Sequence, residues 1–86
     1  MAKASRAARI KAALDVAYGT RGLSKMAADA GISKQLLSFI VAGDREVTDD
    51  VYRKIAEALL LEADRQRAAA NKIDHIAGRM LAELEE

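Results

Sequence analysis

Residues 23–43 constrain the fold of this chain more than any other segment, because only three residues separate two helix-forming stretches. Ser24 can cap the first stretch, which continues through Ala30 with mostly good helix formers. Gly31 is typical of the left-handed residue that closes a helix, and Ser33 can cap the second stretch, residues 34–42. Such a short connection forces the two helices to cross sharply.

The apolar residues of both stretches share one helical face, which we expect to be buried. They are Met26, Ala27 and Ala30 in the first stretch, and Leu36, Leu37 and Ile40 in the second. Ala27 is informative, because two helices that cross at close approach need a small residue at their contact. The spacing therefore predicts a helix-turn-helix motif.

The outer face of the second helix carries side chains that suit contacts with DNA. They are Lys34, Gln35 and Ser38, with Phe39 beside them. Glutamine can pair with adenine, lysine with guanine or phosphate, serine with either kind of group, and an apolar ring with the thymine methyl. The alternative is an ordinary solvated helix face.

The charge distribution favours DNA contact over that alternative. Residues 1–45 contain eight Lys or Arg and three Asp, a net charge of +5, whereas residues 46–86 contain six basic and ten acidic residues, a net charge of −4. The basic half contains the motif, as expected of a nucleic-acid-binding surface.

The motif resembles that of the phage repressor and Cro-type (Xre-like) helix-turn-helix family over about residues 10–61. The resemblance rests on a shared pattern of small, apolar and glycine positions: Ala27, Gly31, Ile32, Leu37, Ile40 and Gly43. It implies an all-α, lambda-repressor-like fold of four or five helices, whose second motif helix reads bases in the major groove.

Carried over position by position, the resemblance implies DNA contacts from the start of the second motif helix. The residues concerned are Ser33, Lys34, Gln35, Ser38 and Phe39. The family often has glutamine at the start of the first motif helix, where this chain has Leu23. We therefore expect Ser24 or Lys25 to supply that phosphate contact.

Three further basic residues are candidates for phosphate contacts. Arg6 and Arg9 lie toward the outer side of a predicted helix over about residues 4–18, and Arg45 follows the second motif helix. Such contacts would add salt-dependent affinity. A solvated helix face is the alternative for Arg6 and Arg9.

The chain after residue 48 is predicted to be helical, with Thr48 as the cap and two aspartates in the first turn. Residues 44–77 contain no Gly or Pro, so one continuous helix over 49–85 is allowed. We instead prefer a break between residues 63 and 71, which would create a fifth helical segment. The predicted domains are a DNA-binding domain, 1–61, and a helical extension for dimerisation, 62–86.

Apolar residues near the end of the chain predict a second interaction surface. The broad apolar stripe consists of Ile73, Ile76, Ala77, Met80, Leu81 and Leu84. Steps of four and three also alternate along positions that we call the heptad seam: Tyr52, Ala56, Leu59, Ala63, Gln66, Ala70, Ile73, Ala77, Met80 and Leu84. We expect a second copy to cover the stripe, giving a homodimer.

The predicted function is that of a transcriptional regulator, in the simplest case a repressor, that binds an inverted repeat in double-stranded DNA. The alternative is a protein–protein module, an antitoxin or anti-activator, that uses the apolar stripe. The chain has no cysteine, one histidine (His75) and no catalytic constellation, so we expect neither an enzyme nor a metal or other cofactor. Without a membrane span or signal peptide, the expected location is a bacterial or phage-infected cytoplasm.

Overall fold

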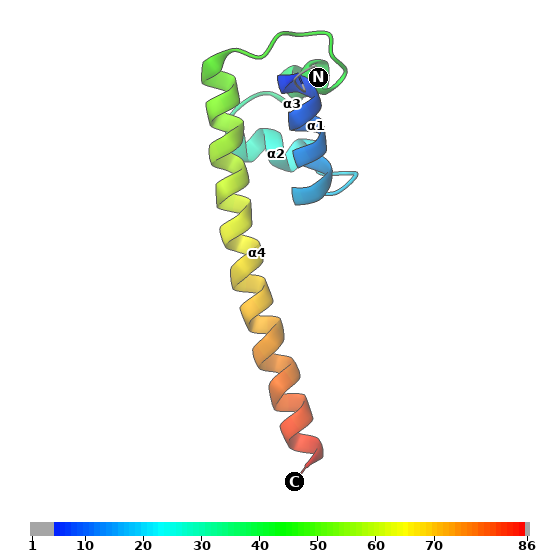
Figure 1. Ribbon diagram of the computed structural model, residues 1–86, viewed down its shortest axis with the longest axis vertical. Helices are drawn as coiled ribbons and strands as arrows, with labels where there is room; N and C mark the ends of the chain where they lie inside the picture. Colours follow the sequence, from blue (N-terminus) through cyan, green and yellow to red (C-terminus); the bar gives the residue numbers. More distant parts are fainter. Residues whose placement is uncertain (1–4, 86) are drawn as a thin grey trace.

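The computed structural model describes residues 5–85, which form four α-helices and, within that range, no strand (Figure 1). The helices are α1 (Arg6–Ala17), α2 (Leu23–Ala30), α3 (Lys34–Val41) and α4 (Asp49–Leu84). The first three pack beside the first half of α4, and its second half extends away alone. We call residues 5–66 the head and residues 67–85 the stalk. The all-α prediction is confirmed, with four helices.

All four helices contribute to one apolar core in the head, formed by Ile10, Leu14, Met26, Ala27, Ala30, Leu37, Ile40, Ile55 and Ala58. The predicted inner faces of the two motif helices are confirmed, with Leu36 partly buried at the edge of this core. None of the helices in residues 5–85 has the combination of length and apolar character that crossing a membrane requires.

Hydroxyl side chains cap three of the four helices. The Ser33 Oγ accepts a hydrogen bond from the Leu36 N–H at 3.0 Å, and the Thr48 Oγ1 accepts one from the Val51 N–H at 3.2 Å. Both caps were predicted and are confirmed. Ser5 caps α1 in the same way. The predicted start of that helix at Ala4 lies outside the described residues.

The predicted Ser24 cap is wrong, because α2 begins at Leu23 and Gly22 occupies the cap position. The reason is a close contact between Gly22 and the end of α1. A Cβ added to Gly22 would lie 2.9 Å from both the carbonyl carbon and the oxygen of Tyr18. The loop therefore turns early, with the Gly22 N–H donating to the Gly19 carbonyl, and Ser24 falls inside the helix.

The predicted break between residues 63 and 71 is also wrong, because α4 is continuous over 36 residues (Figure 1). Nothing in this segment disfavours a helix, since it lacks Gly and Pro and includes the strong helix formers Ala68–Ala70. An ion pair between Arg67 and Asp64, 2.6 Å apart, joins successive turns. Hydrogen bonds from Arg65 to Asp29 and from Gln66 to the Ala17 carbonyl hold α4 at the point where it leaves the core.

Candidate nucleic-acid interface

The geometry of the α2–α3 turn fixes how α3 is presented. Gly31 closes α2 with φ of 69°, in the left-handed region that glycine adopts at low cost. The Ile32 N–H then donates to the Ala27 carbonyl at 3.0 Å, and Ser33 starts α3. Ala27 is only 2% exposed, which agrees with a close approach of the two helices. The predicted helix-turn-helix geometry is therefore present.

The outer face of α3 is open to solvent. Lys34, Gln35 and Ser38 are exposed, and Phe39 is 42% exposed although it is the one phenylalanine of the chain. The opposite face of α3 contributes Leu37 and Ile40 to the core, each fully buried. Buried side chains and the Ser33 cap therefore fix the helix, while its outer side chains stay available to a ligand.

Arg6, a predicted phosphate ligand, is held within the head. Its guanidinium donates a hydrogen bond to the Val47 carbonyl at 3.1 Å and lies 2.8 Å from a carboxylate oxygen of Asp49. It also lies 4.7 Å from the centre of the Tyr52 ring, at cation–π distance. These contacts tie the start of α1 to the start of α4, so a phosphate would compete with them for Arg6.

The other predicted basic ligands differ in their surroundings. Arg9 and Arg45 are exposed, and the described residues include no ion-pair partner for either. Lys25 is exposed as well, but its ammonium lies 3.6 Å from the Glu62 carboxylate of α4. Ser24 is exposed beside it on α2.

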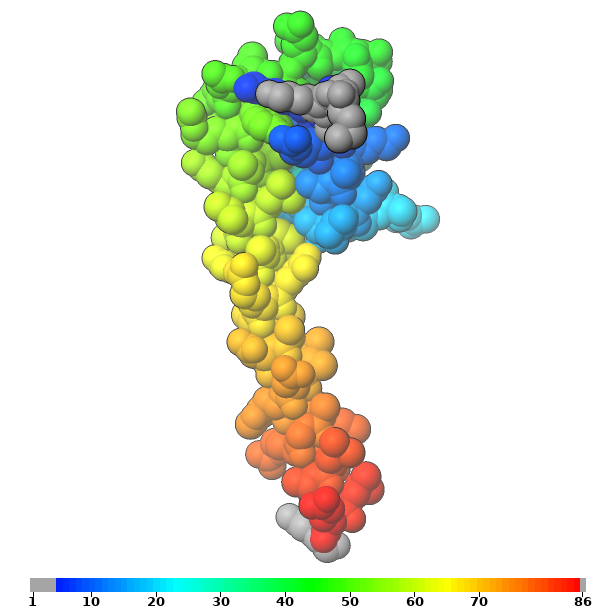
Figure 2. Space-filling view, in the orientation of Figure 1, coloured from blue at the N-terminus to red at the C-terminus, as the bar shows by residue number. Residues whose placement is uncertain are grey.

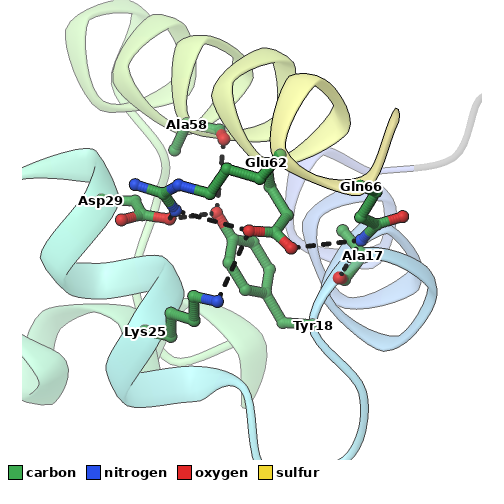
Figure 3. Close-up of polar contacts among 8 residues, drawn as sticks. Ala17, Tyr18, Lys25, Asp29, Ala58, Glu62 and Gln66 are labelled. Atoms are coloured by element: carbon green, nitrogen blue, oxygen red, sulfur yellow. Dashed lines mark hydrogen bonds and ion pairs between the residues drawn. The ribbon is translucent and has the colours of Figure 1, made fainter. Parts of the chain in front are cut away.

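A polar cluster joins α1, α2 and α4 where α4 leaves the core (Figure 3). Arg65 donates to Asp29 at 2.7 Å, and the Tyr18 hydroxyl donates to the same carboxylate at 2.8 Å. The Gln66 amide donates to the Ala17 carbonyl at 2.7 Å. Sequence reasoning missed this cluster, because its members are up to 49 residues apart and their spacing follows no helical or motif pattern.

The contacts in the cluster shift the pKa values of its members. Hydrogen bonds from Arg65 and then Tyr18 lower the pKa of Asp29. The hydrogen bond from Gln66, followed by those from Arg65 and Lys25, lowers the pKa of Glu62 despite its burial. Burial and the bond to Asp29 raise the pKa of Tyr18. The cluster thus stabilises both carboxylates in their charged form.

The predicted dimerisation residues all lie on the stalk, where every described residue is exposed (Figure 2). Five large apolar side chains are at least 58% exposed: Ile73, Ile76, Met80, Leu81 and Leu84. Ala77 lies between them on the helix. Burying this much apolar surface would stabilise an assembly.

The site offers no arrangement that suggests metal chemistry. Over residues 5–85 there is no group of three or more His, Cys, Asp or Glu side chains that could hold a metal ion. The side chains on the outer face of α3 instead suit hydrogen bonding and stacking against another molecule.

A capped helix with an exposed polar face, held across a second helix by a glycine turn, defines a helix-turn-helix DNA-binding domain. The model of a helix-turn-helix family matches residues 19–65, more than half of the chain. The chain therefore belongs to the Cro/C1-type helix-turn-helix family of DNA-binding regulators. Comparisons with curated proteins and with solved structures gave no match.

Proposed function

We propose that this protein is a repressor that binds an inverted-repeat operator as a homodimer. The observation that carries the proposal is the outer face of α3, where Lys34, Gln35 and Ser38 are exposed on a helix fixed by its cap and core contacts. Gln35 and Lys34 would read base edges in the major groove. Ser38 and Phe39 would add a hydrogen bond and an apolar contact.

Phosphate contacts would supply most of the affinity. Arg9 and Arg45 are the strongest candidates, since they are exposed and the described residues pair them with no acid. Ser24, Lys25 and Ser33 lie at the starts of the motif helices, where phosphates commonly bind in such domains. Arg6 would contribute only by giving up its contacts with the head.

Dimerisation would match the symmetry of the protein to that of the operator. In this proposal residues 1–61 bind DNA and residues 62–86 bring two copies together through the apolar stripe. The centres of the half-sites would lie about one turn of DNA apart, ~34 Å. The level of the protein itself would be the simplest control of such a dimer.

A gel shift tests the proposal, using DNA from directly upstream of this protein's own gene at two salt concentrations. The control is a scrambled duplex of equal length and composition. Tight, selective and salt-sensitive binding supports the repressor and points to autoregulation. Weak binding that is equal on both duplexes contradicts it and favours the protein–protein module that uses the apolar stripe.

A further inference from the structure

The heptad seam of α4 alternates large and small side chains from Tyr52 to Met80 and ends on a second large residue, Leu84. From residue 59 to residue 80, one set of positions holds Leu59, Gln66, Ile73 and Met80, and the other set holds only alanine. Ile73 and Met80 are 64% and 60% exposed, so the seam on the stalk is uncovered in a single chain. Any partner must therefore pack against large side chains that alternate with alanines.

We propose that a second copy covers this seam with its α4 helix antiparallel, which rests on the homodimer proposed above. In a parallel pair, identical residues meet, so Ile73–Ile73 layers would alternate with Ala70–Ala70 layers. No single distance between the helices packs both kinds of layer. In an antiparallel pair, each large residue of the seam between residues 63 and 80 faces an alanine, so Met80 packs on the partner's Ala63, and only the two end layers pair Leu59 with Leu84. Uniform layers of this kind fill space well.

The charges beside the seam select one antiparallel register. Arg67 and Asp74 lie one heptad apart on the same edge, and both are exposed. With Leu59 opposite the partner's Leu84, Arg67 faces the partner's Asp74. A shift of one heptad in either direction would instead place Arg67 against the partner's Arg67, or Asp74 against the partner's Asp74. Like charges directly opposite are destabilising.

The other edge of the seam argues against a parallel pair. There the Glu62 carboxylate lies 3.6 Å from the Lys25 ammonium and 3.4 Å from the Arg65 guanidinium. A parallel pair would require Glu62 to bind the partner's Arg67, although Glu62 is 7% exposed and engaged within the head.

The tip of the partner's stalk then reaches a groove on the head. The groove lies between α1 and α4, has a volume of about 190 Å³, and is lined by apolar side chains that include Ile10, Tyr52 and Leu59. The partner's Leu84, 82% exposed in a single chain, would lie at its mouth against Leu59. Arg9 also lines the groove and carries the charge opposite to that of the acidic tip.

The register also sets the separation of the two heads. The two-fold axis would pass between residues 71 and 72, roughly 14 residues from the middle of each head. At 1.5 Å per residue, the middles of the two heads would lie about 42 Å apart along the helix axis.

Cysteine cross-linking tests the orientation, since the chain contains no native cysteine. The variants Ala63→Cys and Met80→Cys are purified separately, mixed without DNA and oxidised. A disulfide between the two variants is expected. In a parallel pair their Cα atoms would be about 25 Å apart along the helix, far beyond the ~7 Å limit for a disulfide. The variant Ala77→Cys should not cross-link to itself.

A charge exchange provides a second readout, by sedimentation. Arg67→Asp and Asp74→Arg should each weaken the dimer, and the double variant should restore it. Arg79→Asp removes the same charge away from the seam and should leave the dimer unchanged. A disulfide between two copies of Ala77→Cys would overturn the antiparallel orientation. A protein that sediments as a monomer and forms neither this disulfide nor the one between Ala63→Cys and Met80→Cys would overturn the pairing of the α4 helices. If the expected cross-links form but the gel shift fails, the operator proposal is rejected and the antiparallel pairing stands.

Discussion

Gln35 combines two properties that a base-reading residue needs, exposure and a fixed backbone. Ser33 caps α3 two residues earlier, and Leu37 and Ile40 anchor the opposite face of the helix. A side chain on such a helix loses little further backbone freedom when it binds, so its hydrogen bonds contribute to discrimination. At this scale the sequence predicted correctly which side chains of α3 are exposed and which are buried, because helical periodicity separates the two faces.

Replacing Gln35 by Ala should relax the sequence preference of binding. If Gln35 pairs with one adenine, its loss should cost ~1–3 kcal/mol on the preferred sequence and little on DNA altered at that base pair. Binding to a panel of single-base operator variants measures this. The control Asn71→Ala removes an exposed amide from the stalk and should change nothing. Equal loss on every sequence would contradict a base-reading role.

Asp29 should make the stability of the head depend on pH. Its hydrogen bonds with Arg65 and Tyr18 lower its pKa in the folded state, so it stabilises the fold above its ordinary pKa near 4. This contribution is lost as the pH falls through the lowered value. Urea unfolding at fixed protein concentration should show a flatter pH dependence below pH ~4 for Asp29→Asn. Asp15→Asn, on an exposed part of α1, is the control. An unchanged slope in Asp29→Asn would contradict the prediction.

The start and end of a helix were predictable from sequence where neighbouring residues decide them. Ser33 and Thr48 cap their helices through local hydrogen bonds, and both predictions are confirmed. Ser24 is an equally good cap residue by its local sequence, but Gly22, in close contact with Tyr18, occupies the cap position of α2 instead. The same limit applies to the polar cluster, since Arg65 reaches an aspartate 36 residues earlier in the chain. Contacts between distant segments of this kind leave no periodic signal.

Enlarging Ala27 should push α2 and α3 apart. Ala27→Leu adds bulk at a position that is 2% exposed, with an expected overpacking cost of about 1–3 kcal/mol. For a domain of this size, each kcal/mol corresponds to a drop in melting temperature of roughly 4–8 °C. Ala28→Leu, on the exposed face of the same helix, is the matched control and should melt near the wild type. Equal melting temperatures for the two variants would show that the helix contact is misplaced.

The whole molecule combines a compact head with a stalk on which every described residue is exposed, and its dimensions are 59 × 32 × 20 Å (Figures 1 and 2). The net positive charge belongs to the first half of the chain, and the acidic residues gather in the second half. Sequence predicted this division of charge and the apolar stripe. It did not predict a single continuous helix, because the absence of helix breakers permits continuity without requiring it.

Placing charges on the stripe should separate the two copies. The double variant Ile73→Asp and Met80→Asp should sediment as a monomer and bind the operator weakly, since two apolar side chains would be replaced by buried charges. The head should stay folded, because no stalk residue belongs to its core. Ala82→Asp, off the stripe, is the control. An unchanged dimer would place the interface elsewhere.

The isolation of the stalk links its own folding to protein concentration. In proteins most helical stability comes from the packing of an apolar face, which the stalk lacks in a single chain. In the proposed dimer, the stalk would therefore acquire order and a partner in the same step, and the ordered fraction would rise more steeply than the protein concentration does. A promoter controlled in this way would have a threshold. Modest dilution of the protein, as during cell growth, would then free the promoter over a narrow range of protein concentration, without any small-molecule inducer.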